Sequence, residues 1–596
     1  MKTLAILFCT AALVGGGVQA MAQPAAGSAD ARFKAIYTEE WNWRRTEMGG
    51  GRGAEQPMDH LPRVDKATQD NRLKHWSDAL AAVVAIPPDQ LSPAERINQA
   101  VYRMQLETLV GDQTFKLYEM PFNSDTQFWS SLASGARRPF RSAEEYRAYI
   151  ARLNDMPRYF QDETVNMRAG LARGFSVPRE TLVGRDGSIL DAADPAKPED
   201  NPFFQPFKNF PKSIPAEEQA SLRAAGLKAV QGSVIPAHQK LLAFYRDEYL
   251  PHARTTLAAE AMPDGKAFYR SQIKEYTSLD LSPEEIHAMG LKEVERIHAE
   301  MLATMQASGF KGSFPEFLQF LRTDPRFYAK TGDELLMRAA WISKKQDGKI
   351  GRYIGHLSRE RFGIDPVPMS IAPFYTSGRG GADVCLMNTY DLPSRPLYNL
   401  TALVLHECSP GHSLQGQIAN ELQGLPAFRR SNHISAYGEG WALYVEKLGR
   451  EMGMYETPYD EFGRETFEMW RACRLVVDTG IHHYGWTRQQ AIDYLKTNTA
   501  LATHDIEIEV DRYITWPGQA LAYKLGEMDI ERMRAKAEAA LGPKFDIRAF
   551  NDALLVQGSV PLPVLNDEIE RYITSGGKDP FAGLADSSRG PERAPD

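Results

Sequence analysis

The stretch His406-Glu407-Cys408-Ser409-Pro410-Gly411-His412 carries the residues of a metal-binding H-E-x-x-H motif at a longer spacing. In the ordinary motif two histidines lie on one face of a helix, beside a glutamate that acts as general base. Here the second histidine follows the first by six positions, which on a regular helix would turn the two side chains roughly 120° apart.

Pro410 resolves this conflict between motif and spacing. It has no N–H to donate to the carbonyl of His406, and it disfavours helical geometry at Ser409. Ser409 and Pro410 also suit the N-cap and first position of a new helix. The sequence therefore predicts a helix break, with His406 and His412 brought together as metal ligands from its two sides.

Residues 1–22 predict a cleavable export signal. Lys2 supplies a positive charge, Leu4 to Val18 an apolar run, and Ala20-Met21-Ala22 a cleavage site. The run is too short and glycine-rich for a membrane span, and Phe8 before Cys9 argues against a lipoprotein anchor. We therefore expect a periplasmic or secreted protein without membrane insertion.

The composition predicts ordinary globular material. The chain is 43% hydrophobic and 10% aromatic, with a net charge of −8 and no basic runs, which argues against nucleic acid and anionic membrane surfaces as partners. Three cysteines, Cys385, Cys408 and Cys473, remain after the signal. An odd, sparse set is no disulfide framework. It permits one bridge, whose partners the sequence leaves open.

Helical signals dominate the chain. Ser92-Pro93-Ala94-Glu95 and Ser282-Pro283-Glu284-Glu285 each read as capped helix starts, and Ser142 opens a helix through Leu153. The segment from Asp191 to Pro215 predicts a long ordered loop. Its phenylalanines are expected to cover core, with an aromatic wall along a binding cleft as the alternative.

The predicted fold class is mainly α: a large two-lobed helical protein with a small β-sheet beside the active-site helix. Two short runs, Val367 to Tyr375 and Ala382 to Thr389, predict a hairpin around Ser377-Gly378-Arg379-Gly380-Gly381. We expect an N-terminal helical lobe over residues 30–330 and a catalytic metal-binding lobe over residues 331–580. Residues 587–596 are expected to form a disordered tail.

A catalytic zinc needs a third protein ligand. The best candidate is Glu439, in a predicted helix where Glu446 follows on the same face as an acceptor for a histidine N–H. His433 is a rival ligand. The alternative to a metal site is a chance His-Glu pair with Glu439 simply solvated.

Beyond these residues, the chain resembles the bacterial domain-of-unknown-function 885 family, whose hallmark is H-E-x-x-P-G-H-x-x-Q. The matching positions here are His406, Glu407, Pro410, Gly411, His412 and Gln415. The match continues through Glu439 to Tyr444, Arg474 to His482, Asp511 to Ile514, Trp516 to Ala520, and Tyr523-Lys524. Weaker similarity reaches towards the N-terminus.

The resemblance implies a predominantly helical, zinc-binding, metallopeptidase-like fold akin to thimet oligopeptidase, angiotensin-converting enzyme and the thermostable carboxypeptidases. Cys408 departs from the family, which usually has a small or aromatic residue there. We expect this cysteine to pack, rather than to bind metal or oxidise.

The remaining candidates follow from the chemistry of peptide hydrolysis. Glu407 would activate water and return a proton to the leaving amine, and His482 and Tyr523 would help the developing oxyanion. His482 is equally well explained as a structural histidine. Arg512 suits a substrate's terminal carboxylate, with an internal ion pair to Asp478 or Asp511 as the alternative, and Asn388 is a candidate for binding substrate backbone.

The sequence therefore predicts an exported zinc-dependent (Zn²⁺) metallopeptidase that hydrolyses short peptides, in the manner of a carboxypeptidase or dipeptidyl-carboxypeptidase. One alternative is a zinc amidase or esterase for a non-peptide or cell-wall-derived substrate. Another is a non-catalytic binding protein on the same scaffold, against which the intact general base Glu407 argues. Endo- or exo-cleavage and the oligomeric state stay open.

Overall fold

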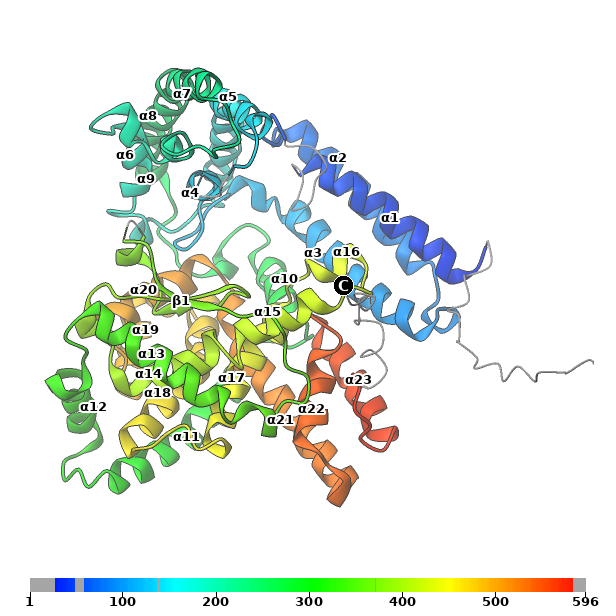
Figure 1. Cartoon of the computed structure of the whole chain (residues 1–596), viewed down its shortest axis with the longest axis vertical. Coiled ribbons are helices and arrows are strands. Elements are labelled where there is room, and N and C mark those ends of the chain that lie inside the picture. Colours follow the sequence, from blue (N-terminus) through cyan, green and yellow to red (C-terminus); the bar gives the residue numbers. More distant parts are fainter. Residues whose placement is uncertain (1–26, 49–57, 137–139, 370, 582–596) are drawn as a thin grey trace, which may run out of the picture.

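The computed structural model describes residues 27–48, 58–136, 140–369 and 371–581 (Figure 1). The predicted signal over residues 1–22 and the predicted tail over residues 587–596 lie outside this part of the chain. The described part is mainly helical with one small sheet, as predicted, and this sheet has three strands rather than the two of the predicted hairpin. None of its helices combines the length and the apolarity needed to cross a bilayer.

Three long helices begin the described chain: α1 (Ala29–Glu47), α2 (Lys66–Val84) and α3 (Pro93–Phe115). They run along the upper right of Figure 1. Their side chains Phe33, Trp76 and Tyr102 share a hydrophobic core with Phe428 and Trp441, more than 300 positions along the chain. The first helices are thus packed against the C-terminal part of the protein.

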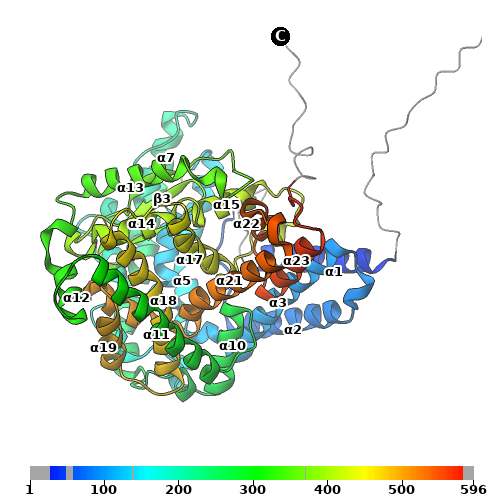
Figure 2. The same cartoon turned by 90° about the horizontal axis from the view of Figure 1, so that it is seen from below.

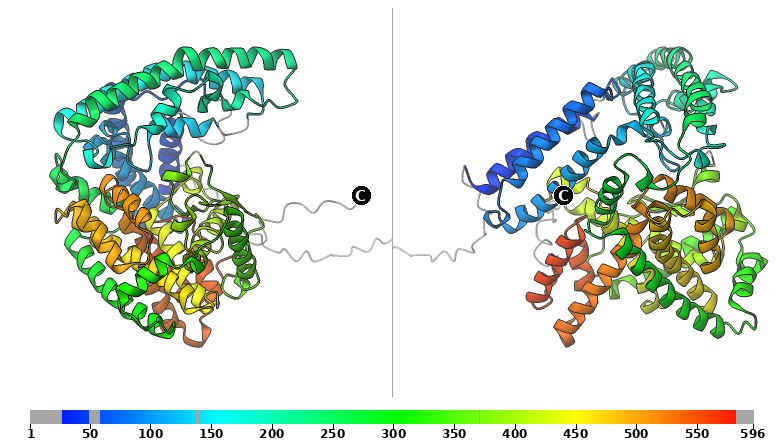
Figure 3. Two further views of the ribbon diagram at one scale, coloured as in Figure 1. Left: turned by 90° about the vertical axis from the view of Figure 1, so that its left-hand side faces the viewer. Right: turned by 180° about the vertical axis from the view of Figure 1, so that it is seen from behind.

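A second group of helices forms an arm that arches over the larger body (Figure 3). It comprises α4 (Phe128–Gly135), α5 (Ala143–Arg173), α6 (Gly187–Ala193), α7 (Ala216–Ala229), α8 (Ile235–Phe244) and α9 (Leu250–His252). The arm has its own core, which includes Phe203, Phe204 and Phe207 from the predicted loop, where only short 3₁₀ turns form after the end of α6 at Ala193. The expectation that these phenylalanines cover core is confirmed.

The remaining helices build the larger body. They are α10 (Gly265–Thr277), α11 (Pro283–Ala307), α12 (Phe314–Thr323), α13 (Gly332–Asp347), α14 (Leu397–Glu407), α15 (His412–Glu421), α16 (Ala427–Arg430), α17 (Ser435–Glu451), α18 (Pro458–His482), α19 (Arg488–Asn498), α20 (Thr503–Thr515), α21 (Ala522–Leu541), α22 (Ile547–Leu555) and α23 (Leu562–Thr574). Helix α18 lies between α11 and α14 (Figure 2).

The hydrophobic cores divide differently from the predicted lobes of 30–330 and 331–580. The core of the arm ends at Ala253. Helices α11 and α12 instead share a core with α14 and α18, because Met301 and Phe317 pack among Phe462 and Val477. Packing between distant segments, rather than sequence order, therefore sets the division.

The predicted helix starts are present, but one helix is longer than expected. Ser92 caps α3 and Ser282 closes a capping box at α11. Helix α5 starts after Ser142, yet it continues past Leu153 and through Pro157 to Arg173. The buried side chains that follow this proline keep the helix in register against the core of the arm, which compensates for the lost donor.

The sheet has the order β1-β3-β2, with β1 (Gly363–Pro366) parallel and β2 (Gly378–Arg379) antiparallel to β3 (Val384–Met387). The strand predicted over Ala382 to Thr389 is present as β3. The prediction of a strand over Val367 to Tyr375 is wrong, because that segment contains a 3₁₀ turn at Ala372–Phe374. Instead, β2 occupies the glycine-rich segment that was expected to be only a turn.

Prolines and one buried amide explain the missing strand. Pro368 and Pro373 have no N–H for a ladder. The side-chain amide of Asn388 donates to the carbonyl oxygens of Ala372 and Tyr375, at 2.9 and 3.0 Å. These bonds hold the segment in a compact turn rather than an extended strand.

Candidate metal centre

The predicted break separates the two histidines of the motif. Helix α14 ends at Glu407 and α15 begins at His412, with a four-residue turn between them. The indole N–H of Trp441 on α17 donates to the carbonyl of Pro410 at 2.9 Å and holds this turn. A Cβ at Gly411 would lie 1.9 Å from the carbonyl oxygen of His406, so the reversal requires glycine.

Glu439 of α17 completes a group of three converging side chains. One ligand atom from each of His406, His412 and Glu439 lies within 4.8 Å of the others. Oε2 of Glu439 stands 3.4 Å from Nε2 of His406 and 3.3 Å from Nε2 of His412. This buried oxygen has no hydrogen-bond partner among the described residues. Two imidazoles and a carboxylate aimed at one point fit a zinc ion.

Glu446 fixes the orientation of the first histidine. It lies two turns after Glu439 on α17, and its Oε1 accepts a 2.7 Å hydrogen bond from Nδ1 of His406. The bond assigns the proton to Nδ1 and leaves Nε2 as the free ligand atom. The acceptor role predicted for Glu446 is therefore present in the structure.

Charge within the group is balanced by protons. Burial disfavours a charged His406, but its bonds to Glu439 and Glu446 raise its pKa to about 9. Burial also opposes ionisation of Glu439, yet His412 and His406 hold the pKa of its carboxyl well below the usual range. A divalent cation at this point would take the place of those protons.

His433 lies beside this centre but outside the converging group. A Cβ at Gly438 would stand 3.2 Å from its ring carbon Cε1, so the ring packs against the start of α17. The residue as a whole is exposed at the surface. The structure therefore favours Glu439 over His433 as the third ligand.

Glu407 is held under strand β2. The backbone N–H of Gly380 donates to its Oε2 at 2.7 Å. A Cβ at Gly380 would lie 1.9 Å from the carbonyl oxygen of Glu407 and 2.6 Å from Cβ of His412. The glycine-rich segment is thus the cover of the motif, a role that the turn prediction missed. The signal for it was the set of closely spaced glycines, which allow such a close approach.

A disulfide ties this cover to the motif. Cys385 of β3 is bonded to Cys408, with their Cα atoms 5.4 Å apart. The expectation that Cys408 only packs is therefore wrong. The sequence could not pair the cysteines, because their proximity depends on β3 lying beside the end of α14. The remaining Cys473 is buried and free.

Tyr523 stands next to the three converging side chains. Its ring lies 6.4 Å from the ring of His406, at an interplanar angle of 12°. Its hydroxyl accepts from Nη2 of Arg512 at 3.4 Å, and the guanidinium of Arg474 lies 4.1 Å from its ring centroid. The structure therefore places Tyr523 beside His406, and its role in a reaction stays a prediction.

Arg512 pairs with neither acid suggested by the sequence. Its Nη1 stands 3.7 Å from Glu509, and its Nη2 donates to Gln519 at 3.2 Å. Asp478 accepts from the hydroxyl of Tyr269. The other proposed partner, Asp511, pairs with Arg185 and Arg488 instead.

His482 takes the structural alternative. Its Nε2 donates to the carbonyl of Tyr513 at 2.9 Å, and its Nδ1 accepts from the N–H of Ala259 at 3.1 Å. Burial lowers its pKa to about 3. Both ring nitrogens are occupied, so His482 has no donor left for an oxyanion.

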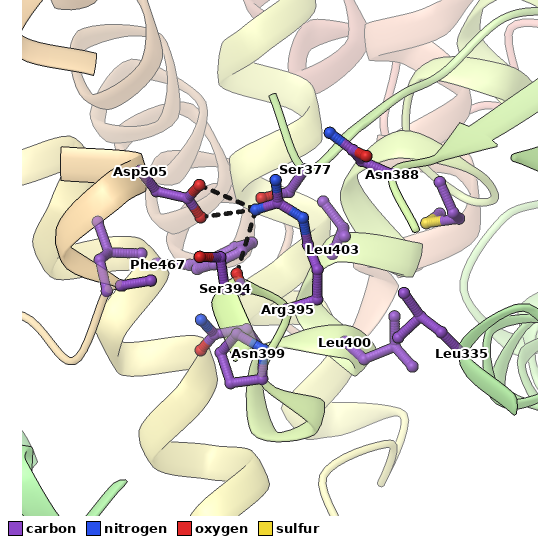
Figure 4. Close-up of a pocket in the computed structure, with 14 residues that line it drawn as sticks. Leu335, Ser377, Asn388, Ser394, Arg395, Asn399, Leu400, Leu403, Phe467 and Asp505 are labelled. Carbon is purple, nitrogen blue, oxygen red and sulfur yellow. Dashed lines mark hydrogen bonds and ion pairs between the residues drawn. The ribbon is translucent and has the colours of Figure 1, made fainter. Parts of the chain in front are cut away.

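Asn388 is also occupied, beside a small separate cavity (Figure 4). Its amide group holds backbone, since Oδ1 accepts from the N–H of Tyr390 in addition to the bonds that the amide donates. The cavity has a volume of about 20 Å³ and is crossed by an ion pair between Arg395 and Asp505 at 2.9 Å. This volume holds about one water molecule, not a substrate.

Two solved structures resemble the chain over nearly its full length. A protein of Colwellia psychrerythraea described as a "putative lipoprotein" has a TM-score of 0.84 at 27% identity, covering 92% of this chain and 100% of its own. A "putative lipoprotein of unknown function" of Shewanella oneidensis has a TM-score of 0.67 at 17% identity, covering 91% and 99%. The second likeness shows the fold alone. Comparison with curated proteins gives no match.

The family resemblance is supported across the whole site. A family model described as "Bacterial protein of unknown function" matches residues 44–569. That span includes α14 and α15, which carry the motif, together with Glu439 on α17 and Tyr523 on α21. The chain therefore belongs to the DUF885 family of bacterial proteins.

Proposed function

We propose that this protein is an exported zinc-dependent hydrolase that cleaves amide bonds in short peptides. The observation that carries the proposal is the convergence of His406, His412 and Glu439 next to the carboxylate of Glu407. Two histidines and one glutamate form a ligand set that peptide-cleaving zinc enzymes use, with one position left for water. A zinc ion held there supplies Lewis-acid activation of water and of the substrate carbonyl.

Glu407 is the proton carrier in this proposal. It takes a proton from water as the water oxygen bonds to the carbonyl carbon, and it delivers a proton to the amine nitrogen as the C–N bond breaks. One water is consumed, and a carboxylate and an amine are formed. The N–H of Gly380 holds Oε2, which leaves Oε1 for the transfer.

Tyr523 is the proposed donor to the developing oxyanion. Its hydroxyl accepts from Arg512, so its own O–H is free to point towards the reacting carbonyl. The guanidinium of Arg474 lies over the ring of Tyr523 and that of Arg512 bonds its hydroxyl. Both positive charges favour a negative charge close by. Both ring nitrogens of His482 are bonded to backbone groups, so Tyr523 is the remaining candidate donor to the oxyanion.

Two observations support export and an oxidising location. The Colwellia protein is described as a "putative lipoprotein", and lipoproteins are a class of exported protein. The bridge between Cys385 and Cys408 suits an oxidising compartment such as the periplasm. The two-lobed, metallopeptidase-like architecture implied by the family resemblance belongs to the same proposal.

The test is hydrolysis by the zinc-loaded protein of a mixed library of short peptides, followed by mass spectrometry. We expect defined cleavage products, and a loss of roughly 100-fold or more in kcat for Glu407→Gln with zinc retained. Glu456→Gln, at a side chain 66% exposed, is the matched control and should keep full activity. Cleavage of amide or ester probes but of no peptide would favour the amidase alternative. Zinc binding without any turnover would favour a binding protein.

A further inference from the structure

Two buried arginines beside Tyr523 share a single acid. Nη2 of Arg474 stands 2.9 Å from Oε2 of Glu509, and Nη1 of Arg512 stands 3.7 Å from Oε1 of the same carboxylate. Tyr523 contacts both guanidinium groups. Two positive charges therefore face one negative charge, which leaves a surplus positive charge in the protein interior.

The surplus is accompanied by unused donors. Nη1 of Arg474 and Nε of Arg512 are buried and have no hydrogen-bond partner among the described residues. The Arg474 side chain is 2% exposed. Uncompensated buried charge is costly, because the protein interior stabilises it far less than water does. A bound anion would balance the surplus charge and accept hydrogen bonds from the unused donors.

A carboxylate could reach this site from solvent through Arg512, whose side chain keeps 18% exposure. The charge of one further acid, Asp125, also reaches Arg512. Asp125 is itself exposed, so water screens its charge and it does not neutralise the buried pair. The anion that fits is therefore one brought by a ligand.

The position of this surplus charge connects it to the reaction centre. Tyr523 receives the hydrogen bond of Arg512 on its hydroxyl, and its ring lies near that of His406. One side chain thus separates the guanidinium from the metal-binding group. A peptide held by its terminal carboxylate at Arg512 would present a bond near its C-terminal end to that group.

We infer that Arg512, backed by the charge of Arg474, binds the free α-carboxylate of a peptide substrate, so that cleavage removes residues from the C-terminus. This inference rests on the proposed hydrolase function. Arg512 makes the direct contact because its side chain is less buried than that of Arg474, 18% exposed against 2%. Arg474 acts as a positioning residue, since it is covered and reaches the ligand only through its field and through Tyr523.

The experiment compares otherwise identical short peptides that carry either a free or an amidated C-terminus. For the zinc-loaded parent, kcat/KM should be roughly 10- to 100-fold higher for the free acid, the factor expected for a charge-assisted hydrogen bond. Arg512→Gln should bring the ratio of kcat/KM for the acid to kcat/KM for the amide close to one. Arg379→Gln removes an exposed arginine on β2, whose guanidinium lies over the ring of Tyr375, and should preserve the ratio.

A binding measurement separates this inference from the hydrolase proposal. Titration calorimetry of the Glu407→Gln protein with N-acetyl-alanyl-alanine and with its amide needs no turnover. We expect the acid to bind roughly 10-fold or more tightly than the amide, and Arg512→Gln in the same background to equalise them. Equal binding of acid and amide, or a preference that survives Arg512→Gln in correctly folded protein, would overturn the inference. Preferential acid binding without hydrolysis would instead count against the proposed function.

Discussion

Nδ1 of His406 donates a 2.7 Å hydrogen bond to Oε1 of Glu446, and this bond joins α14 to α17 behind the proposed metal-binding group. It fixes which nitrogen of His406 faces Glu439 and His412. Nη2 of Arg471 also approaches Oε1 of Glu446, at 3.5 Å. The geometry of the proposed metal site is therefore built partly by Glu446, a residue that would not touch the metal.

Replacing Glu446 by glutamine should weaken zinc binding. The amide keeps the size of the side chain but removes the charge that makes His406 a stronger ligand, and such changes typically cost roughly 10- to 100-fold in metal affinity. Competition titration with a zinc chelator measures the effect. Glu451→Gln on the same helix, at a side chain 46% exposed, is the control and should bind zinc like the parent. Unchanged affinity in Glu446→Gln would remove the orienting role.

The three converging residues should prove to be the complete set of protein ligands. His406→Ala, His412→Ala and Glu439→Ala should each lose stoichiometric zinc, because each removes one of three ligands. His433→Ala should keep it, since this ring lies outside the group. Elemental analysis of purified, folded protein provides the measurement. A His433 variant without zinc, together with a Glu439 variant that retains it, would reverse the assignment.

Loss of the disulfide should lower stability and disturb the site. The bridge between Cys385 and Cys408 closes a loop with a sequence separation of 23. Chain-entropy arguments give a stabilisation of about 3 kcal/mol for a loop of this size. Cys385→Ser with Cys408→Ser should therefore unfold at lower urea concentration, and kcat should fall because Glu407 precedes the bridge. A reductant should destabilise the parent in the same way and leave the double variant unchanged.

His482 should make the protein less stable in acid. Its pKa is about 3 in the folded state, against an ordinary value near 6.5, because burial disfavours the charged ring. The unfolded chain therefore binds this proton below about pH 6.5 while the folded chain does not. Stability should be lost as the pH falls from 6.5 towards 3, by up to about 1.4 kcal/mol per pH unit from this residue.

The comparison that isolates this effect is the slope of unfolding free energy against pH. His482→Asn should be less stable at neutral pH, since it breaks two buried hydrogen bonds, but its stability should fall less steeply on acidification. Equal slopes in parent and variant would show that the ring is already charged in the folded protein.

Arg512→Lys should restore only part of the preference for a free C-terminus that Arg512→Gln removes. Lysine keeps the positive charge but cannot make a bidentate contact with a carboxylate. The ratio of kcat/KM for acid and amide peptides should lie between those of the parent and Arg512→Gln. A ratio equal to that of the parent would show that charge alone is recognised.

The sequence predicted those parts of the site that depend on neighbouring residues. Pro410 removes a helical donor wherever the helix lies in the fold, so the break between His406 and His412 could be anticipated. Glu439 and Glu446 share a helix face, so one of them could reach the metal-binding group while the other reached a histidine. The capped starts at Ser92 and Ser282 were equally local.

Tertiary structure alone decided which distant residues meet. The partner of Cys408, the acid opposite Arg474 and the backbone groups that occupy His482 all lie on other segments of the chain. Residue type leaves such a side chain several roles, and burial against particular neighbours selects one. For the same reason the glycine-rich segment around β2 was predicted as a turn. Only the tertiary structure shows that it covers Glu407. The sequence determined the chemistry available at the site, and packing determined which of those groups remained free to use it.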